Sequence, residues 1–206
     1  MQRRGLRKGR TAVLVGAALG LAAVTVRGRG RSLDDRVFAW ANSEIHHPAL
    51  DRFLRAITEL GSLYASTAAA AALALRGRRR EGLDALGAAA SMWVVGQALK
   101  EAFRRARPYE TGNPLRLLIA KPRGASWPSS HPAVLLAFVT VAARNLELQP
   151  GQRSALTALA GLVGASRVYL GVHYPVDVVG GVLLGRVVAD LWSAGISPRT
   201  VGGPGG

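Results

Sequence analysis

The stretch SRVYLGVHYPVDVVGGVLLG, residues 166–185, decides the fold of this chain because it joins two apolar segments through a short polar turn. Arg167 lies near the end of the first segment, where an unpartnered guanidinium would be costly. His173 and Asp177 are four residues apart around Pro175, so a carboxylate in the first helical turn can reach back to the imidazole and fix its tautomer. We expect a helical hairpin whose turn holds either a functional His–Asp pair or a satisfied interfacial one.

Apolar segments of similar length recur along the chain, separated by stretches rich in arginine, glycine and proline. Segments of about 20 apolar residues can cross a bilayer as helices. Residues 32–60 are mixed instead, with apolar side chains at helical spacing among charges, as in one or two amphipathic helices that lie on the membrane or pack over the bundle. We predict an all-α integral membrane bundle of about six transmembrane helices, with this amphipathic segment between the first and the second. The predicted spans are residues 11–26, 61–75, 83–99, 131–143, 154–170 and 175–192.

Arginine-rich stretches set the expected orientation. Residues 1–10 form a basic N-terminus, and the turn at 76–80 carries four arginines, so we place both in the cytoplasm. The membrane domain then covers residues 11–193, and a Gly/Pro-rich tail at 194–206 is expected to be disordered. This topology predicts a multi-pass protein of the cell membrane, with the turn at 171–174 on its extracytoplasmic face.

The composition excludes several classes of function. A net charge of +15 over 206 residues would suit a nucleic-acid-binding protein. The basic residues lie between apolar segments, however, as they do in the cytoplasmic loops of membrane proteins, so we expect no nucleic-acid partner. The chain has no cysteine, which excludes disulfides, a thiol nucleophile and a thiolate metal site.

A pair of cations precedes Pro108. Lys100 and Arg107 are seven residues apart, close to two helical turns, so we expect them to share a helix face about 10 Å apart along the axis. Both side chains could then converge on one anion, and Pro108 would end the helix. The alternative is a pair of cations that snorkel to the membrane interface. For Arg104 and Arg105 we expect either steering of an anionic headgroup or simple interfacial anchoring.

A second polar cluster opens the apolar segment that follows Pro128. Ser129 and Ser130 read as the hydroxyl cap of a helix, and His131 lies in its first turn. The free backbone N–H groups and the positive dipole end of such a helix bind phosphate well. The alternative is a structural cap with an incidental histidine.

Two histidines and one carboxylate also occur together in non-haem iron sites. Here the three cations Lys100, Arg107 and Arg167 would repel a divalent ion, and no further acidic cluster compensates for them. A cationic pocket prefers an anion. We therefore predict phosphoryl transfer without a metal and without another cofactor.

The three clusters together resemble a known family. The pattern K-x6-R-P at residues 100–108, P-S-x-H at 128–131 and S-R-x5-H-x3-D at 166–177 is similar to the three signature motifs of the PAP2 superfamily, the type 2 phosphatidic acid phosphatase and vanadium haloperoxidase group. The order of the three motifs and the spacings within them agree with those of the family. One position departs from the pattern, because Ser130 stands where the family usually has glycine, and its side chain could narrow the pocket.

The resemblance implies a role for each residue. His173 would be the nucleophile that forms a phosphohistidine, held by Asp177, and His131 would protonate the leaving group and then activate water. The phosphate oxygens would be bound by Lys100, Arg107, Ser129, Ser130 and Arg167.

The implied function is that of a metal-independent membrane lipid phosphatase that acts on a lipid phosphate in the bilayer. Candidate substrates are an undecaprenyl or decaprenyl phosphate or diphosphate, phosphatidylglycerol phosphate and phosphatidic acid. Two alternatives remain: a membrane protein that binds lipid phosphate without turnover, and a vanadate-dependent haloperoxidase.

Overall fold

The structure is a computed structural model that describes residues 2–26, 31–112 and 115–195. Within these ranges every regular element is helical and none is a strand, which confirms the all-α prediction. All but two residues of the predicted Gly/Pro-rich tail lie outside the described residues. The α-helices are α1 (Gln2–Val26), α2 (Arg31–Ala39), α3 (Pro48–Thr58), α4 (Leu63–Leu75), α5 (Arg79–Phe103), α6 (Ser130–Asn145), α7 (Pro150–Tyr169) and α8 (Pro175–Gly195).

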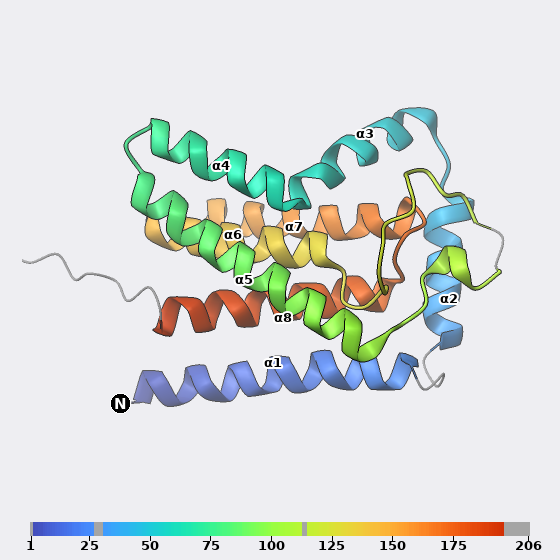
Figure 1. The fold of residues 1–206 in the computed structure, drawn as a ribbon, viewed down its shortest axis with the longest axis horizontal. Helices are drawn as coiled ribbons and strands as arrows, with labels where there is room; N and C mark the ends of the chain where they lie inside the picture. Colours follow the sequence, from blue (N-terminus) through green and yellow to red (C-terminus); the bar gives the residue numbers. More distant parts are fainter. Residues whose placement is uncertain (1, 27–30, 113–114, 196–206) are drawn as a thin grey trace, which may run out of the picture.

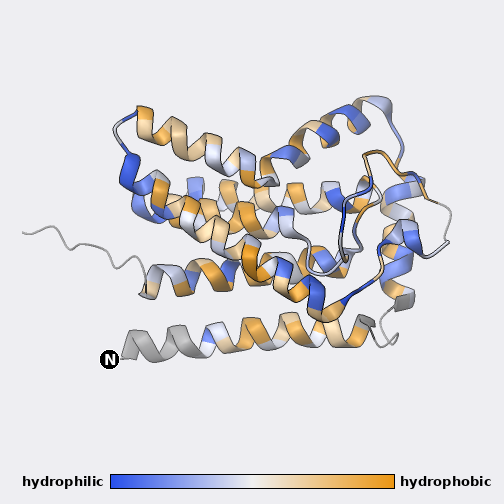
Figure 2. Ribbon diagram, in the orientation of Figure 1, coloured by the Kyte–Doolittle hydropathy of each residue, from blue (hydrophilic) through white to orange (hydrophobic). Residues whose placement is uncertain are grey.

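The helices α1, α4, α5, α6, α7 and α8 run along the long axis of the molecule, and α2 lies across one end of them (Figure 1). Helix α6 is the centre of the bundle, because it packs against α5, α7 and α8. Its residues from Pro132 to Val139 are all buried, as expected for a helix that is apolar on every side. The polar segments gather at the two ends, whereas the long helices are mainly apolar between them (Figure 2).

Helices α6 and α8 are in backbone contact through glycine. A Cβ atom at Gly181 would lie 2.3 Å from the carbonyl oxygen of Ser129, and one at Gly185 would lie 2.5 Å from that of Ala133. Small residues of this kind let helix backbones approach closely, which is the usual packing of helices in a membrane. The contact at Gly181 holds the start of α6 directly beside the first turns of α8.

One described helix, α8, is by itself long and apolar enough to cross a membrane. The stretches Gly9–Val24 and Leu63–Leu75 are apolar but shorter. The predicted amphipathic segment at 32–60 is helical: it consists of α2, a π-helical turn (Trp40–Glu44), α3 and a 3-10 turn (Glu59–Gly61). It forms the wall of the bundle at the end where the three motifs meet (Figure 1).

The prediction that Lys100 and Arg107 share one helix face is wrong. Helix α5 ends at Phe103, and Arg104 adopts a left-handed backbone conformation with φ of 45°. The Arg104 N–H group donates to the carbonyl of Lys100 at 2.9 Å, which is a common way to end a helix. The chain therefore leaves the helix before Pro108, and Arg107 reaches the site from an extended segment.

Candidate active site

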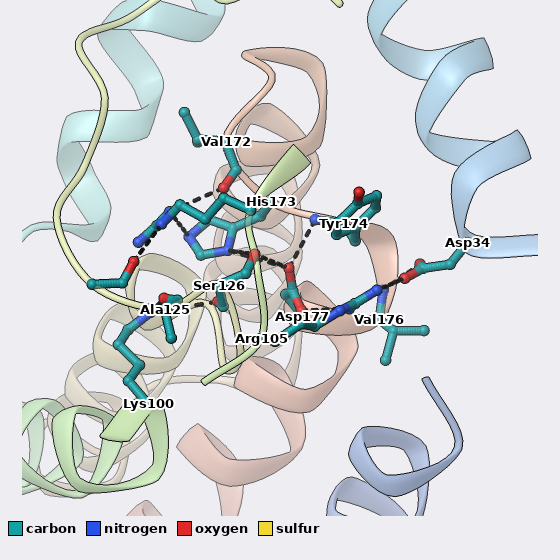
Figure 3. Close-up of polar contacts among 12 residues, drawn as sticks. Asp34, Lys100, Arg105, Ala125, Ser126, Val172, His173, Tyr174, Val176 and Asp177 are labelled. Atoms are coloured by element: carbon teal, nitrogen blue, oxygen red, sulfur yellow. Dashed lines mark hydrogen bonds and ion pairs between the residues drawn. The ribbon is translucent and has the colours of Figure 1, made fainter. Parts of the chain in front are cut away.

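The site lies at the end of the bundle that α2 covers, where the end of α5, the start of α6 and the turn between α7 and α8 meet (Figures 1 and 3). Lys100 comes from the last turn of α5, Arg107 from the segment after it, and His173 from the turn between α7 and α8. The structure buries most of the predicted residues, namely Lys100, Arg107, Ser129, Arg167, His173 and Asp177, and half-buries Ser130 and His131.

The two ring nitrogens of His173 face different partners (Figure 3). Arg107 Nη1 lies 3.2 Å from Nε2. Because a guanidinium has no acceptor, this contact is favourable only when Nε2 is the acceptor, which puts the ring proton on Nδ1. Nδ1 lies 3.5 Å from Asp177 Oδ2 and 3.4 Å from Ser126 Oγ. The geometry thus leaves a lone pair on Nε2, beside the cations, and directs the N–H group toward a carboxylate.

Asp177 is held by more groups than the imidazole. Its Oδ2 accepts hydrogen bonds from Ser126 Oγ and from the backbone N–H of Tyr174, the latter at 2.8 Å. Its Oδ1 accepts from Arg105 Nη1 at 2.6 Å. The carboxylate is 0% exposed, so these bonds fix both its position and its orientation.

Lys100 and Arg107 also order the loop before α6. Lys100 Nζ donates to the carbonyl of Ala125 at 2.7 Å. Arg107 Nε donates to the carbonyl of Gly124 at 2.8 Å, and its Nη1 donates to that of Val172 at 2.9 Å. The two cations therefore tie this loop to the His173 turn, which keeps their charges at one place.

Ser129 occupies the N-cap position of α6, but the expected hydroxyl cap does not form. The backbone N–H of Ser129 donates instead to the carbonyl of Asp177 at 2.9 Å. Among the described residues, the buried atoms Ser129 Oγ, Ser130 Oγ and Arg167 Nε have no hydrogen-bond partner. Buried polar groups are nearly always paired, so unpaired ones near a helix N-terminus fit an oxyanion with several acceptor oxygens.

The wall that α3 and the following turn form closes the site around Arg167 and His131. Arg167 Nη1 donates to Thr58 Oγ1, which is fully buried, at 3.0 Å. A Cβ atom at Gly61 would lie 2.6 Å from the Cβ of His131, so this turn is in close contact with the histidine. The end of the amphipathic segment, at Thr58 and Gly61, is therefore part of the wall of the site.

Ser130, the departure from the motif, is accommodated by a glycine on the neighbouring helix. A Cβ atom at Gly96 of α5 would lie 3.5 Å from Ser130 Oγ, an ordinary contact distance. The hydroxyl thus has room on the side of α5.

Electrostatics favour a neutral imidazole at His173. Burial lowers the pKa of His173 well below its ordinary value, and the positive charges of Lys100 and Arg107 lower it further. At neutral pH the ring is therefore uncharged, as a nitrogen nucleophile must be.

Four residues of the site were not predicted as such: Asp34, Thr58, Arg105 and Ser126. Asp34 and Thr58 lie in the amphipathic segment, and Arg105 was expected either to steer a headgroup or to anchor at the interface. Ser126 lies two residues before Pro128 without any distinctive spacing. No group of three His, Cys, Asp or Glu side chains in the described part of the chain is arranged to hold a metal ion.

Comparison with known proteins identifies relatives. The chain is 38% identical over 99 residues to the undecaprenyl-diphosphatase of Sulfolobus acidocaldarius, which covers 48% of this chain and 47% of that protein. It is 35% identical over 120 residues to the decaprenylphosphoryl-5-phosphoribose phosphatase of Mycobacterium tuberculosis, which covers 58% of this chain and 64% of that protein. The matched regions thus span about half to two thirds of the length of these relatives.

The fold has a close counterpart among solved structures. The crystal structure of a transmembrane PAP2-type phosphatidylglycerolphosphate phosphatase from Bacillus subtilis superposes with a TM-score of 0.73 at 25% sequence identity, covering 93% of this chain and 98% of that one. The sequence profile of the PAP2 superfamily matches residues 81–200, a range that contains all three motifs. On the agreement of profile, fold and motif order, the chain belongs to the PAP2 superfamily.

Proposed function

We propose that the chain is a membrane lipid phosphatase that hydrolyses a phosphate monoester or diphosphate of a lipid through a phosphohistidine. The observation that carries this proposal is the placement of His173: a buried imidazole whose Nε2 faces Arg107 and whose pKa is lowered by burial and by the neighbouring cations. Around it are unpaired donors on Ser129 and Arg167, suited to the oxygens of a phosphate. A phosphate bound there would place phosphorus next to a nitrogen nucleophile.

The first step forms a bond between Nε2 of His173 and phosphorus. The P–O bond to the lipid breaks, and His131 donates a proton to the departing oxygen. The imidazole becomes positively charged, and Asp177 stabilises it through the Nδ1–H group. Arg107 Nη1 lies beside Nε2 when no substrate is bound. In this step its N–H group donates a hydrogen bond to a phosphate oxygen instead.

The second step hydrolyses the phosphohistidine. His131 accepts a proton from water, the water oxygen bonds to phosphorus, and the P–N bond breaks, which returns neutral His173 and releases phosphate. Lys100, Arg107 and Arg167 neutralise the charge on the phosphoryl oxygens in both steps. No step requires a metal ion.

The relatives guide the choice of lipid. Two of them are named for prenyl-linked phosphates and one for phosphatidylglycerolphosphate, so we propose a substrate with long apolar chains. The long helices beside the site present apolar side chains outward, among them Trp93 and Val94 of α5 and Val179 of α8, so the substrate can remain in the bilayer. We further propose six membrane crossings, with α3 and α4 together forming one of them, and the site on the extracytoplasmic face.

The experiment that tests this function is a phosphate-release assay in detergent with purified protein. The panel holds undecaprenyl diphosphate, phosphatidylglycerol phosphate and phosphatidic acid side by side, each with and without EDTA. We expect release from at least one lipid and equal rates in EDTA. No release from any member would leave the protein as a lipid-binding protein, and activity that is lost on chelation and restored by one metal would contradict the phosphohistidine mechanism.

A further inference from the structure

The Arg105 guanidinium is shared between two buried carboxylates (Figure 3). Its Nη1 donates to Asp177 Oδ1 at 2.6 Å, and its Nη2 donates to Asp34 Oδ2. The side chains of Arg105, Asp34 and Asp177 are 8%, 1% and 0% exposed. A charged group this deeply buried must be paired, so the three form one electrostatic unit with a net charge of −1.

Asp34 brings its charge to this unit from α2, on the other side of the site. Its Oδ1 accepts a hydrogen bond from the backbone N–H of Val176, in the first turn of α8, at 3.0 Å. One turn further along α2, Phe38 packs on Tyr174 with ring centroids 5.4 Å apart, and Arg105 stacks over the same Tyr174 ring at 4.4 Å. Asp34 is thereby held at a fixed position beside the His173 turn.

The sharing has an electrostatic consequence for Asp177. If Arg105 bound Asp177 alone, the two charges would cancel, and the carboxylate would be a weaker acceptor for the Nδ1–H of His173. A second carboxylate on the same guanidinium takes up part of its positive charge. Asp177 then keeps its capacity to stabilise the positive charge that develops on the imidazole.

We propose that Asp34 is a positioning residue for this reaction: by sharing Arg105 it keeps the Asp177 carboxylate available to His173. This inference rests on the proposed function, because it concerns the charge that His173 acquires on phosphorylation. Asp34 itself contacts neither His173 nor the unpaired donors of the phosphate site, and it acts only through Arg105 and Asp177.

The test is a double-mutant cycle in the full-length protein, with phosphate release measured over substrate concentration. Asp34→Asn should lower kcat about 10-fold, the low end for residues that orient an active-site group, and leave KM nearly unchanged because the phosphate-binding cations are intact. The double variant Asp34→Asn with Arg105→Gln removes the uncompensated cation and keeps a neutral donor to Asp177. It should therefore recover most of the lost kcat.

A purely structural ion pair gives the opposite result, namely a double variant at least as impaired as Asp34→Asn. That outcome, or an Asp34→Asn variant with wild-type kcat, would overturn the inference. If thermal unfolding shows that Asp34→Asn does not fold, Asp34→Glu is used instead. This variant keeps the charge and should retain kcat within about threefold. A loss of kcat of about 10-fold with the fold intact would count against the inference. The matched control is Asp51→Asn, which breaks a half-buried pair with Arg116 at the same end of the bundle and should keep the wild-type kcat.

A readout without turnover separates this inference from the proposed function. The Nδ1 proton of His173 can be observed by NMR with labelled histidine and assigned by its absence in His173→Gln. The resonance of this proton should move upfield in Asp34→Asn, because Asp177 becomes a weaker hydrogen-bond acceptor. In the double variant it should return toward its wild-type position. An unmoved resonance overturns the inference even if wild-type protein releases no phosphate, a result that by itself contradicts only the proposed function.

Discussion

At the scale of single residues, the proposed mechanism depends on keeping one imidazole neutral among cations. His173 is almost fully buried, and Arg107 donates to its Nε2 while the Nδ1 side faces Asp177. Three cations that would stabilise a bound phosphate also make a proton on the imidazole unfavourable. In the proposed mechanism the same charges would therefore bind the substrate and keep the nucleophile neutral.

This arrangement predicts how stability depends on pH. The pKa of His173 lies well below its ordinary value in the folded protein, so between these two values the unfolded chain binds the extra proton. The contribution of neutral His173 to the free energy of unfolding is fully present above about pH 6.5. It is lost as the pH falls toward the folded-state pKa, by at most about 1.4 kcal/mol per pH unit. Thermal unfolding from pH 7.5 to 5 should show a steeper loss for wild type than for His173→Gln. Parallel curves would contradict a lowered pKa.

At the scale of elements, the position of the α6 N-terminus depends on its contact with α8. The carbonyl of Ser129 lies where a side chain at Gly181 would have to be. The start of α6 carries both His131 and the unpaired serine hydroxyls, so a displacement here would move the proposed phosphate site as a whole.

Gly181→Ala should therefore destabilise the protein by about 1–3 kcal/mol and lower kcat, because a backbone carbonyl must move to admit the methyl group. Gly161→Ala on α7 is the control, since a Cβ atom there meets nothing within 4 Å. That variant should be neutral or stabilised by up to about 1 kcal/mol, with unchanged activity. The two variants are compared by thermal unfolding and by phosphate release. Equal stability of the two variants would show that α6 and α8 are not in backbone contact.

The site also shows which of its features could be predicted from the sequence. Lys100, Arg107 and His173 could be predicted because placing an ionisable group beside apolar segments costs free energy unless it serves a function, and the structure brings the three together. The link from Asp34 to Arg105 spans 71 residues and depends on how α2 folds back over the site, which no local pattern encodes. The turn at Arg104 was missed because a left-handed arginine has no sequence signal of the kind that glycine gives.

At the scale of the whole molecule, cations lie at both ends of the bundle, and those at the site end include Arg105 and Arg107, which are engaged in the site. The α4–α5 turn, with its arginines, lies at the end opposite the site, together with the end of α8 (Figure 1). A bundle placed across a membrane by the positive-inside rule would have this end in the cytoplasm and the site outside.

Cysteine labelling tests this orientation directly, because the chain has no cysteine of its own. Arg79 and Lys121 are both exposed. Arg79 begins α5 next to the α4–α5 turn, whereas Lys121 lies over the Tyr109 ring, in the segment that follows Arg107. Lys121→Cys should react with a membrane-impermeant maleimide in intact cells, and Arg79→Cys only after permeabilisation. The reverse pattern would place the site in the cytoplasm.

The most direct test of the central claim, that the protein hydrolyses lipid phosphate through His173, is to trap the phosphoenzyme. Purified protein is mixed with a substrate from the panel that carries labelled phosphate and is quenched within one turnover under alkaline denaturing conditions. Wild type should carry label that is stable to alkali and labile to acid, His131→Asn should accumulate more of it, and His173→Gln should carry none and release no phosphate. Label or phosphate release at wild-type levels in His173→Gln would contradict the account.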